Sequence, residues 1–179
     1  MNHMIQSVLI TGKLDDARLA RALGELADLS SLPASVWKPV IVVDSDGGDS
    51  NAQSAFLECI FADQQTRALV EGARVKIYNA QSAAAIIALS FGGHREMAAG
   101  TSIGFHLPLL TLDYWNTDRD DRVANSVFED CRRHELSLGQ LMDRYGLNEP
   151  TLKSELYSSG WLLLTAEECL RRGLVQALF

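Results

Sequence analysis

The stretch that decides the fold is Val40-Ile41-Val42-Val43-Asp44-Ser45-Asp46-Gly47-Gly48. Its four successive β-branched residues are typical of a strand that is buried on both faces of a parallel sheet. The glycines that follow allow a turn with positive φ, in which backbone N–H groups face a ligand. We predict that this turn leads into a long helix over residues 51–70. A buried strand that turns through glycines into a helix indicates an α/β protein.

Short apolar strands alternate with helical stretches along the rest of the chain. We predict strands over 7–11, 74–78, 95–98, 102–106, 161–164 and 174–179, and helices over 15–29, 82–91, 118–145 and 149–157. Residues 107–117 are predicted to form a loop, and Thr165 with Glu168 forms a capping-box pattern that predicts one more helix start. Because no linker or repeat interrupts this pattern, residues 1–179 are predicted to form a single domain.

Composition excludes several classes of function. The chain has 179 residues, of which 47% are hydrophobic, and its net charge of −7 without a basic stripe argues against nucleic-acid binding. The widely spaced Cys59, Cys131 and Cys169 show no zinc-type spacing, so we expect reduced thiols, no metal and no cofactor. No apolar run approaches the ~20 residues that span a bilayer, and no signal sequence is evident. We therefore expect a cytoplasmic protein without membrane contacts.

Ser82 is the candidate nucleophile, because it lies where a predicted strand passes into a predicted helix. At that place free N–H groups and the helix dipole favour a developing negative charge. The small neighbours Ala80, Ala83 and Ala84 leave room for a substrate chain. The alternative is that Ser82 only caps the helix, which is a common role for serine. The GxSxG turn of α/β-hydrolases is absent, and its absence argues against that fold.

His106 is the candidate general base. It ends a predicted strand and follows Ser82 by 24 positions (106 − 82). From the end of a strand its ring can point toward a cleft, although a half-buried structural histidine is the alternative. The remaining histidines pair less well with a serine, because we predict His3 at a loose terminus, His94 in a turn and His134 on a polar helix face.

The Gly47-Gly48 loop has three other interpretations. It is an ordinary strand-to-helix turn in the simplest of them. A calcium loop that starts at Asp44 would need a bidentate acid where Ala55 stands, so we predict no metal site. No GxGxxG pattern is present, which excludes a dinucleotide fingerprint.

In this order the segments resemble the ClpP family of serine peptidases, which share the ClpP/crotonase fold. The similar segments, which span nearly the whole chain, are Val8-Leu9-Ile10-Thr11-Gly12, Ser45-Asp46-Gly47-Gly48 (Ser-Pro-Gly-Gly in the family), Ala80-Gln81-Ser82-Ala83 (Ala-Ala-Ser-Met), Phe105-His106-Leu107-Pro108 (Ile-His-Gln-Pro) and Leu164-Thr165-Ala166-Glu167-Glu168. The resemblance implies a spiral of ββα units, with residues 118–145 as a protruding handle helix.

The resemblance also implies an activity. Ser82 would be the nucleophile and His106 its base, while the backbone N–H groups of Gly47 and Ala83 would form the oxyanion hole. The substrate would be a peptide or unfolded protein, hydrolysed without a cofactor inside a homo-oligomer built from heptameric rings.

Two departures from the family pattern bear on this expectation. The family places its triad aspartate just before the Leu-Thr-Ala segment, where residues 158–161 contain no acid. Glu155, Ser159 or a backbone carbonyl is then left to orient the imidazole. Only residues 1–6 precede the first strand, whereas the family uses a longer segment to contact a AAA+ unfoldase. An unfoldase remains a candidate partner that this departure argues against.

Two further functions stay open beside a serine peptidase. One is a catalytically weak or inactive ClpP-like paralogue that serves as an assembly or binding subunit. The other is a crotonase-type acyl-CoA enzyme, which would share the fold and the paired oxyanion N–H groups. The Ser82–His106 pair argues against the acyl-CoA enzyme, as does the lack of a basic cluster in the sequence for the nucleotide end of CoA.

Overall fold

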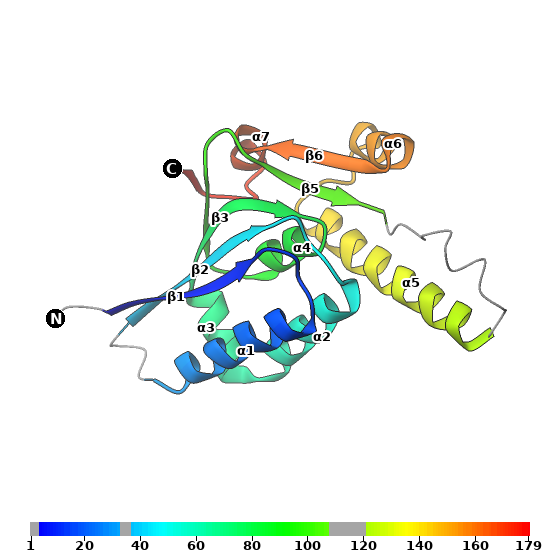
Figure 1. Ribbon diagram of the computed structural model, residues 1–179. Helices are drawn as coiled ribbons and strands as arrows, with labels where there is room; N and C mark the ends of the chain where they lie inside the picture. Colours follow the sequence, from blue (N-terminus) through cyan, green and yellow to red (C-terminus); the bar gives the residue numbers. More distant parts are fainter. Residues whose placement is uncertain (1–3, 33–36, 108–120) are drawn as a thin grey trace.

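The computed structural model describes residues 4–32, 37–107 and 121–179 and shows a mixed α/β fold (Figure 1). Its strands are β1 (Met4–Thr11), β2 (Trp37–Ser45), β3 (Arg74–Gln81), β4 (His94–Met97), β5 (Ser102–His106), β6 (Trp161–Thr165) and β7 (Ala177–Leu178). Its helices are α1 (Asp16–Ser30), α2 (Ser50–Ala62), α3 (Gln64–Gly72), α4 (Ala83–Ser90), α5 (Asp121–Arg144), α6 (Pro150–Ser159) and α7 (Ala166–Arg171). The predicted α/β class is confirmed, whereas most of the predicted loop and helix residues 118–120 lie outside the described residues.

One mixed sheet organises the described residues. Its parallel strands follow the order β1-β2-β3-β4-β7, while β5 leaves this path to pair parallel with β3 and antiparallel with β6. The apolar run 40–43 lies inside β2, between β1 and β3. The carboxyl ends of β2, β3 and β5 therefore lie close together, and open α/β sheets place their ligand sites at such ends.

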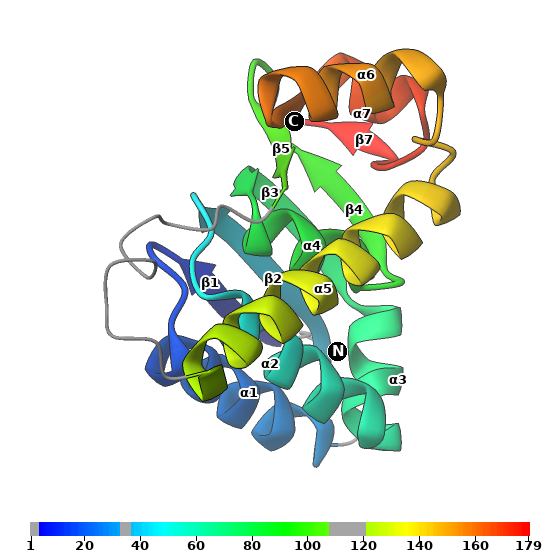
Figure 2. The same ribbon diagram turned by 90° about the vertical axis from the view of Figure 1, so that its right-hand side faces the viewer.

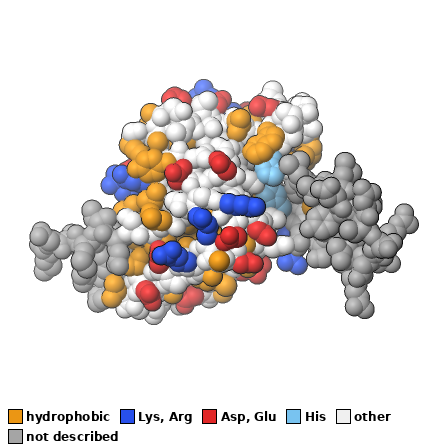
Figure 3. Space-filling model, in the orientation of Figure 1, with side chains coloured by type: hydrophobic (Ala, Val, Ile, Leu, Met, Phe, Trp, Pro, Cys, Tyr) orange, Lys and Arg blue, Asp and Glu red, His pale blue; other side chains and the backbone are white. Residues whose placement is uncertain are grey.

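Helices α1 to α4 cover one face of the parallel strands, and α5 crosses over α2 and α4 (Figures 1 and 2). Residues 83–89 of α4 are all buried, so this helix lies in the core. On the face shown in Figure 3, acidic and basic side chains are interspersed without a large patch of one sign. This mixed surface is consistent with the absence of a basic stripe in the sequence.

Two element predictions differ most from the structure in extent, while β1 begins three residues earlier (7 − 4) and β3 ends three residues later (81 − 78) than predicted. The helix predicted over 51–70 breaks at Asp63, whose extended backbone (φ −92°, ψ 116°) ends α2. The Asp63 carboxylate accepts the Thr66 N–H at 2.7 Å and so caps α3. Hydrogen bonds from the side chain and then the backbone N–H of Thr66 lower the pKa of Asp63. The strand predicted over 174–179 shortens to β7, because only this part is in register with β4.

The capping box predicted in the C-terminal part of the chain is confirmed. The Thr165 hydroxyl accepts the Glu168 N–H, and the Glu168 carboxylate accepts the Thr165 N–H, so that the predicted capping box begins α7. Gly146 follows α5 with φ 64°, the left-handed conformation that glycine adopts readily at a helix end.

Candidate active site

Ser82 occupies a strained turn between β3 and α4. Its backbone lies at φ 55° and ψ −124°, and it is the one non-glycine residue with positive φ in the described part of the chain. Its hydroxyl makes no capping hydrogen bond, so the helix-cap alternative finds no support. Such a conformation costs about 1–3 kcal/mol and persists only where the surrounding structure imposes it.

The pairing of β3 with β5 holds Ser82 in place. The Ser82 N–H donates to Gly104 O at 2.8 Å, next to the Gln81–Gly104 register pair. A Cβ atom on Gly104 would collide with the Gln81 side-chain amide, which itself donates to Ser102 O at 3.1 Å. The absence of a side chain at Gly104 therefore lets β5 approach the serine turn.

Gly47 lies directly against Ser82. A Cβ atom on Gly47 would come within 2.7 Å of Ser82 Cβ and 3.3 Å of Ala83 N. The two predicted oxyanion groups therefore flank the serine. Only one of these two N–H groups is free to bind an oxyanion. The Ala83 N–H belongs to the first turn of α4, where N–H groups lack partners within the helix. The Gly47 N–H, by contrast, donates to Ser45 Oγ at 3.0 Å.

His106 ends β5 and is half-buried. Its Nδ1 lies 2.6 Å from Leu107 O. Because a carbonyl only accepts hydrogen bonds, this contact assigns the proton to Nδ1 and leaves Nε2 as the basic nitrogen. Histidine atoms reach the surface on the face shown in Figure 3. Within the described residues, no hydrogen bond joins the His106 ring to the Ser82 hydroxyl.

The residues predicted to replace the triad aspartate do not reach His106. Glu155 lies exposed on α6, and its backbone carbonyl accepts the Ser159 hydroxyl at 2.8 Å. Ser159 also lies 2.6 Å from Trp161 O, so it caps the end of α6. The group that meets Nδ1 is the carbonyl of Leu107, one of the three kinds of orienting group that the sequence left open.

Two further residues enclose the His106 ring: Trp161, to which the sequence analysis gave no role in the site, and His134, for which the predicted polar helix face is wrong. The Trp161 ring lies 4.5 Å from it, centroid to centroid, and the His134 ring lies 5.9 Å away. His134 is buried, and its Nε2 donates to His106 O at 3.3 Å. Burial lowers the pKa of His134. The helical spacing of His134 with the apolar Leu138 and Leu141 was the signal for its burial.

No protein-family model matches the sequence, and comparison with curated proteins also finds no match. The described residues hold no group of three or more His, Cys, Asp or Glu that could bind a metal ion. No described helix combines the length and apolarity needed to cross a membrane. The site is therefore defined by geometry: a strained serine, a facing glycine turn and a histidine on the adjacent strand.

Proposed function

We propose that this chain is a serine peptidase of the ClpP type, folded as a ClpP/crotonase-like spiral, with Ser82 as its nucleophile. The observation that carries the proposal is the strained backbone of Ser82 at the start of α4. A serine turn of this kind presents a hydroxyl beside free helix N–H groups, which is what an acyl-transfer nucleophile needs. The cofactor-free chemistry uses only residues of this chain.

The reaction follows from the roles of the two side chains. The Ser82 oxygen bonds to the carbonyl carbon of a peptide while Nε2 of His106 takes the hydroxyl proton. The C–N bond then breaks, and the amine leaves with that proton. Water, deprotonated by the same nitrogen, hydrolyses the ester and restores Ser82. The Ala83 N–H stabilises the oxyanion, and the Gly47 N–H joins it when it leaves Ser45 Oγ.

Assembly into a homo-oligomer is part of the proposal. The sheet leaves Leu9, Tyr78 and Phe179 exposed at 57%, 43% and 44%. Tyr78 and Phe179 also contact each other, with ring centroids 5.2 Å apart. An apolar sheet surface of this kind supports packing against further copies of the chain, in rings of seven by family resemblance. A AAA+ unfoldase remains a second candidate for this surface.

Covalent labelling tests the proposed chemistry. A fluorophosphonate probe is expected to form one adduct on Ser82, located by peptide mass spectrometry. Ser82→Ala should abolish the adduct and His106→Gln should slow it about 10³-fold or more, while Ser158→Ala, at an exposed serine of α6, should leave it unchanged. A folded, assembled sample without an adduct would contradict the peptidase proposal.

Two observations favour a second candidate, a paralogue of ClpP without turnover that serves as an assembly subunit. Trp161 rather than an acid packs against His106, and the Gly47 N–H is already bonded. This candidate predicts rings in native mass spectrometry but no labelling of Ser82. The same sample therefore discriminates between the two functions.

A further inference from the structure

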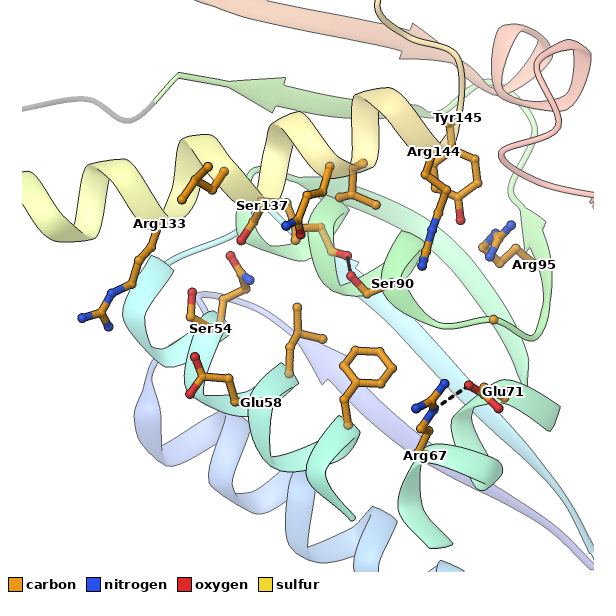
Figure 4. A pocket seen from close by; sticks show the side chains of 18 residues that line it. Ser54, Glu58, Arg67, Glu71, Ser90, Arg95, Arg133, Ser137, Arg144 and Tyr145 are labelled. Carbon is orange, nitrogen blue, oxygen red and sulfur yellow. Dashed lines mark hydrogen bonds and ion pairs between the residues drawn. The ribbon is translucent and has the colours of Figure 1, made fainter. Parts of the chain in front are cut away.

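A second site lies away from Ser82, in a cavity of about 1050 Å³ between α2, α3, α4 and α5 (Figure 4). We call it the arginine cavity, because Arg67, Arg95, Arg133 and Arg144 line it. These arginines are dispersed in the sequence and come together only in the fold. None of the proposed catalytic groups lines this cavity.

Two of the arginines, Arg95 and the exposed Arg144, lie at one end of the cavity, where the Arg95 guanidinium also stacks 5.3 Å from the centroid of the Tyr145 ring. Arg95 is buried, and its guanidinium donates to Leu174 O and to Phe91 O, both at 2.6 Å. Carbonyls satisfy hydrogen bonds but do not neutralise the charge. Among the described residues, no carboxylate lies within ion-pair distance of Arg95 or Arg144.

The electrostatics of this end favour an anion. Burial lowers the pKa of Arg95; Tyr145 raises it in part, and the nearby charge of Arg144 lowers it again. Figure 4 shows both side chains, together with Tyr145, at the same end. Arg67 differs from them, because its guanidinium already pairs with Glu71 at 2.9 Å. A desolvated cation beside a second cation is costly unless an anion compensates it.

Gln53 adds an independent observation from the wall formed by α2. Its side chain is 1% exposed, and neither its amide nitrogen nor its amide oxygen has a hydrogen-bond partner. Buried amides are normally satisfied in folded proteins. Gln53 lines the arginine cavity, so a group bound there can supply both missing bonds. A peptide bond offers the matching donor and acceptor.

We propose that the arginine cavity binds a short apolar peptide through its free C-terminal carboxylate. The carboxylate lies between Arg95 and Arg144, where two guanidinium groups can each donate two hydrogen bonds. A backbone amide of the peptide pairs with the Gln53 amide. Apolar side chains of the peptide contact Leu57, Phe61 and Leu141, which also line the cavity. This binding does not depend on the peptidase chemistry proposed for Ser82.

Calorimetric titration with the peptide acetyl-Leu-Leu-Leu tests the site, with the same peptide as its C-terminal amide for comparison. The Ser82→Ala variant is used so that no cleavage occurs. The free carboxylate should bind at least about tenfold more tightly than the amide. Inorganic phosphate is titrated as a third ligand. If it binds as tightly as the peptide, the site recognises an anion alone and the peptide proposal is overturned.

Substitutions in the cavity lining test whether the peptide binds in the arginine cavity. Arg144→Gln should weaken the carboxylate peptide about tenfold and remove the preference over the amide. Gln53→Leu should weaken both peptides about fivefold, without lowering the melting temperature of the unliganded protein, because it removes an unsatisfied amide. Arg132→Gln, on the same helix but outside the cavity lining, is the matched control and should leave the affinity unchanged.

Photo-crosslinking separates this site from the proposed active site. A carboxylate peptide that carries a benzophenone side chain should label α2 or α5. Labelling confined to the segments around Ser82 and His106, or binding unchanged in both Arg144→Gln and Gln53→Leu, would overturn the inference. Because the titration uses Ser82→Ala, its outcome is independent of whether Ser82 reacts with a fluorophosphonate.

Discussion

His106 and Trp161 face each other across the antiparallel ladder of β5 and β6, with ring centroids 4.5 Å apart. The indole therefore packs against the imidazole at a tilt of 43° and brings no carboxylate to the ring. Orientation is left to Leu107 O, which lies 2.6 Å from Nδ1. A carbonyl fixes the tautomer but stabilises an imidazolium less than a carboxylate does. This pairing predicts that Ser82 reacts slowly with a fluorophosphonate.

Trp161→Asp should accelerate the reaction of Ser82. The new carboxylate would lie on the strand facing His106 and stabilise the imidazolium that forms as the serine loses its proton. We expect the rate of fluorophosphonate labelling to rise about tenfold above that of Trp161→Asn, which loses the same indole without adding charge. Stopped-flow labelling measures both rates. Equal rates for the two variants would show that position 161 has no access to the imidazole.

His134 should make stability depend on pH. Burial lowers its pKa below the 6.5 of an unfolded histidine. Below about pH 6.5 the unfolded chain therefore binds more protons than the native one, so stability is full above this pH and is lost as the pH falls through the native pKa. For one proton the slope is at most about 1.4 kcal/mol per pH unit.

His134→Gln is the variant that isolates this effect, because its amide can still donate to His106 O but does not titrate. Urea unfolding of the wild type and the variant should show the steeper loss of stability on acidification in the wild type. If stability falls equally with pH in the wild type and in the variant, burial does not oppose protonation of His134 in the native state.

Gly47→Ala should destabilise the fold and abolish labelling of Ser82. The residue has φ 93°, and its Cβ would lie 2.7 Å from both Gln81 O and Ser82 Cβ. Left-handed strain and this clash together should cost at least about 2 kcal/mol. Gly100→Ala, at φ 76° with nothing near its Cβ, is the control and should lose only the strain energy. Thermal unfolding compares the stability of the two variants. Equal losses of stability would contradict the predicted clash of the Gly47→Ala methyl group with Ser82.

The three cysteines should differ in their reaction with iodoacetamide. Burial raises the pKa of Cys169 to about 12, and its thiol donates to Leu164 O at 3.6 Å. Cys59 is exposed and Cys131 is half-buried. Cys59 should therefore be alkylated first in the native protein, and Cys169 only after unfolding in urea. Mass spectrometry after timed quenching gives the order, and early alkylation of Cys169 would indicate local opening around α7.

Much of the fold was readable from local sequence. The β-branched run 40–43 predicts a central strand, and the alanine-rich segment after Ser82 predicts a buried helix; both are confirmed. The break at Asp63 was missed because the apolar spacing continues through it. An aspartate can end one helix and cap the next without disturbing that spacing.

In the candidate site, too, some features follow from the local sequence and others only from the tertiary structure. The sequence by itself placed Ser82 at a strand-to-helix turn and His106 at a strand end, because turn chemistry and hydrophobic periodicity are local properties of the chain. Only the tertiary structure decided what surrounds them: the Leu107 carbonyl, the Trp161 ring and the bond from the Gly47 N–H to Ser45.

The clustering of charged side chains also depends on the tertiary structure. A chain of net charge −7 shows no basic cluster in its sequence, yet the packing of α2, α3, α4 and α5 gathers four arginines around one cavity. Strand register and helix crossing set which distant side chains meet, and neither is encoded in the spacing of residues along a single element.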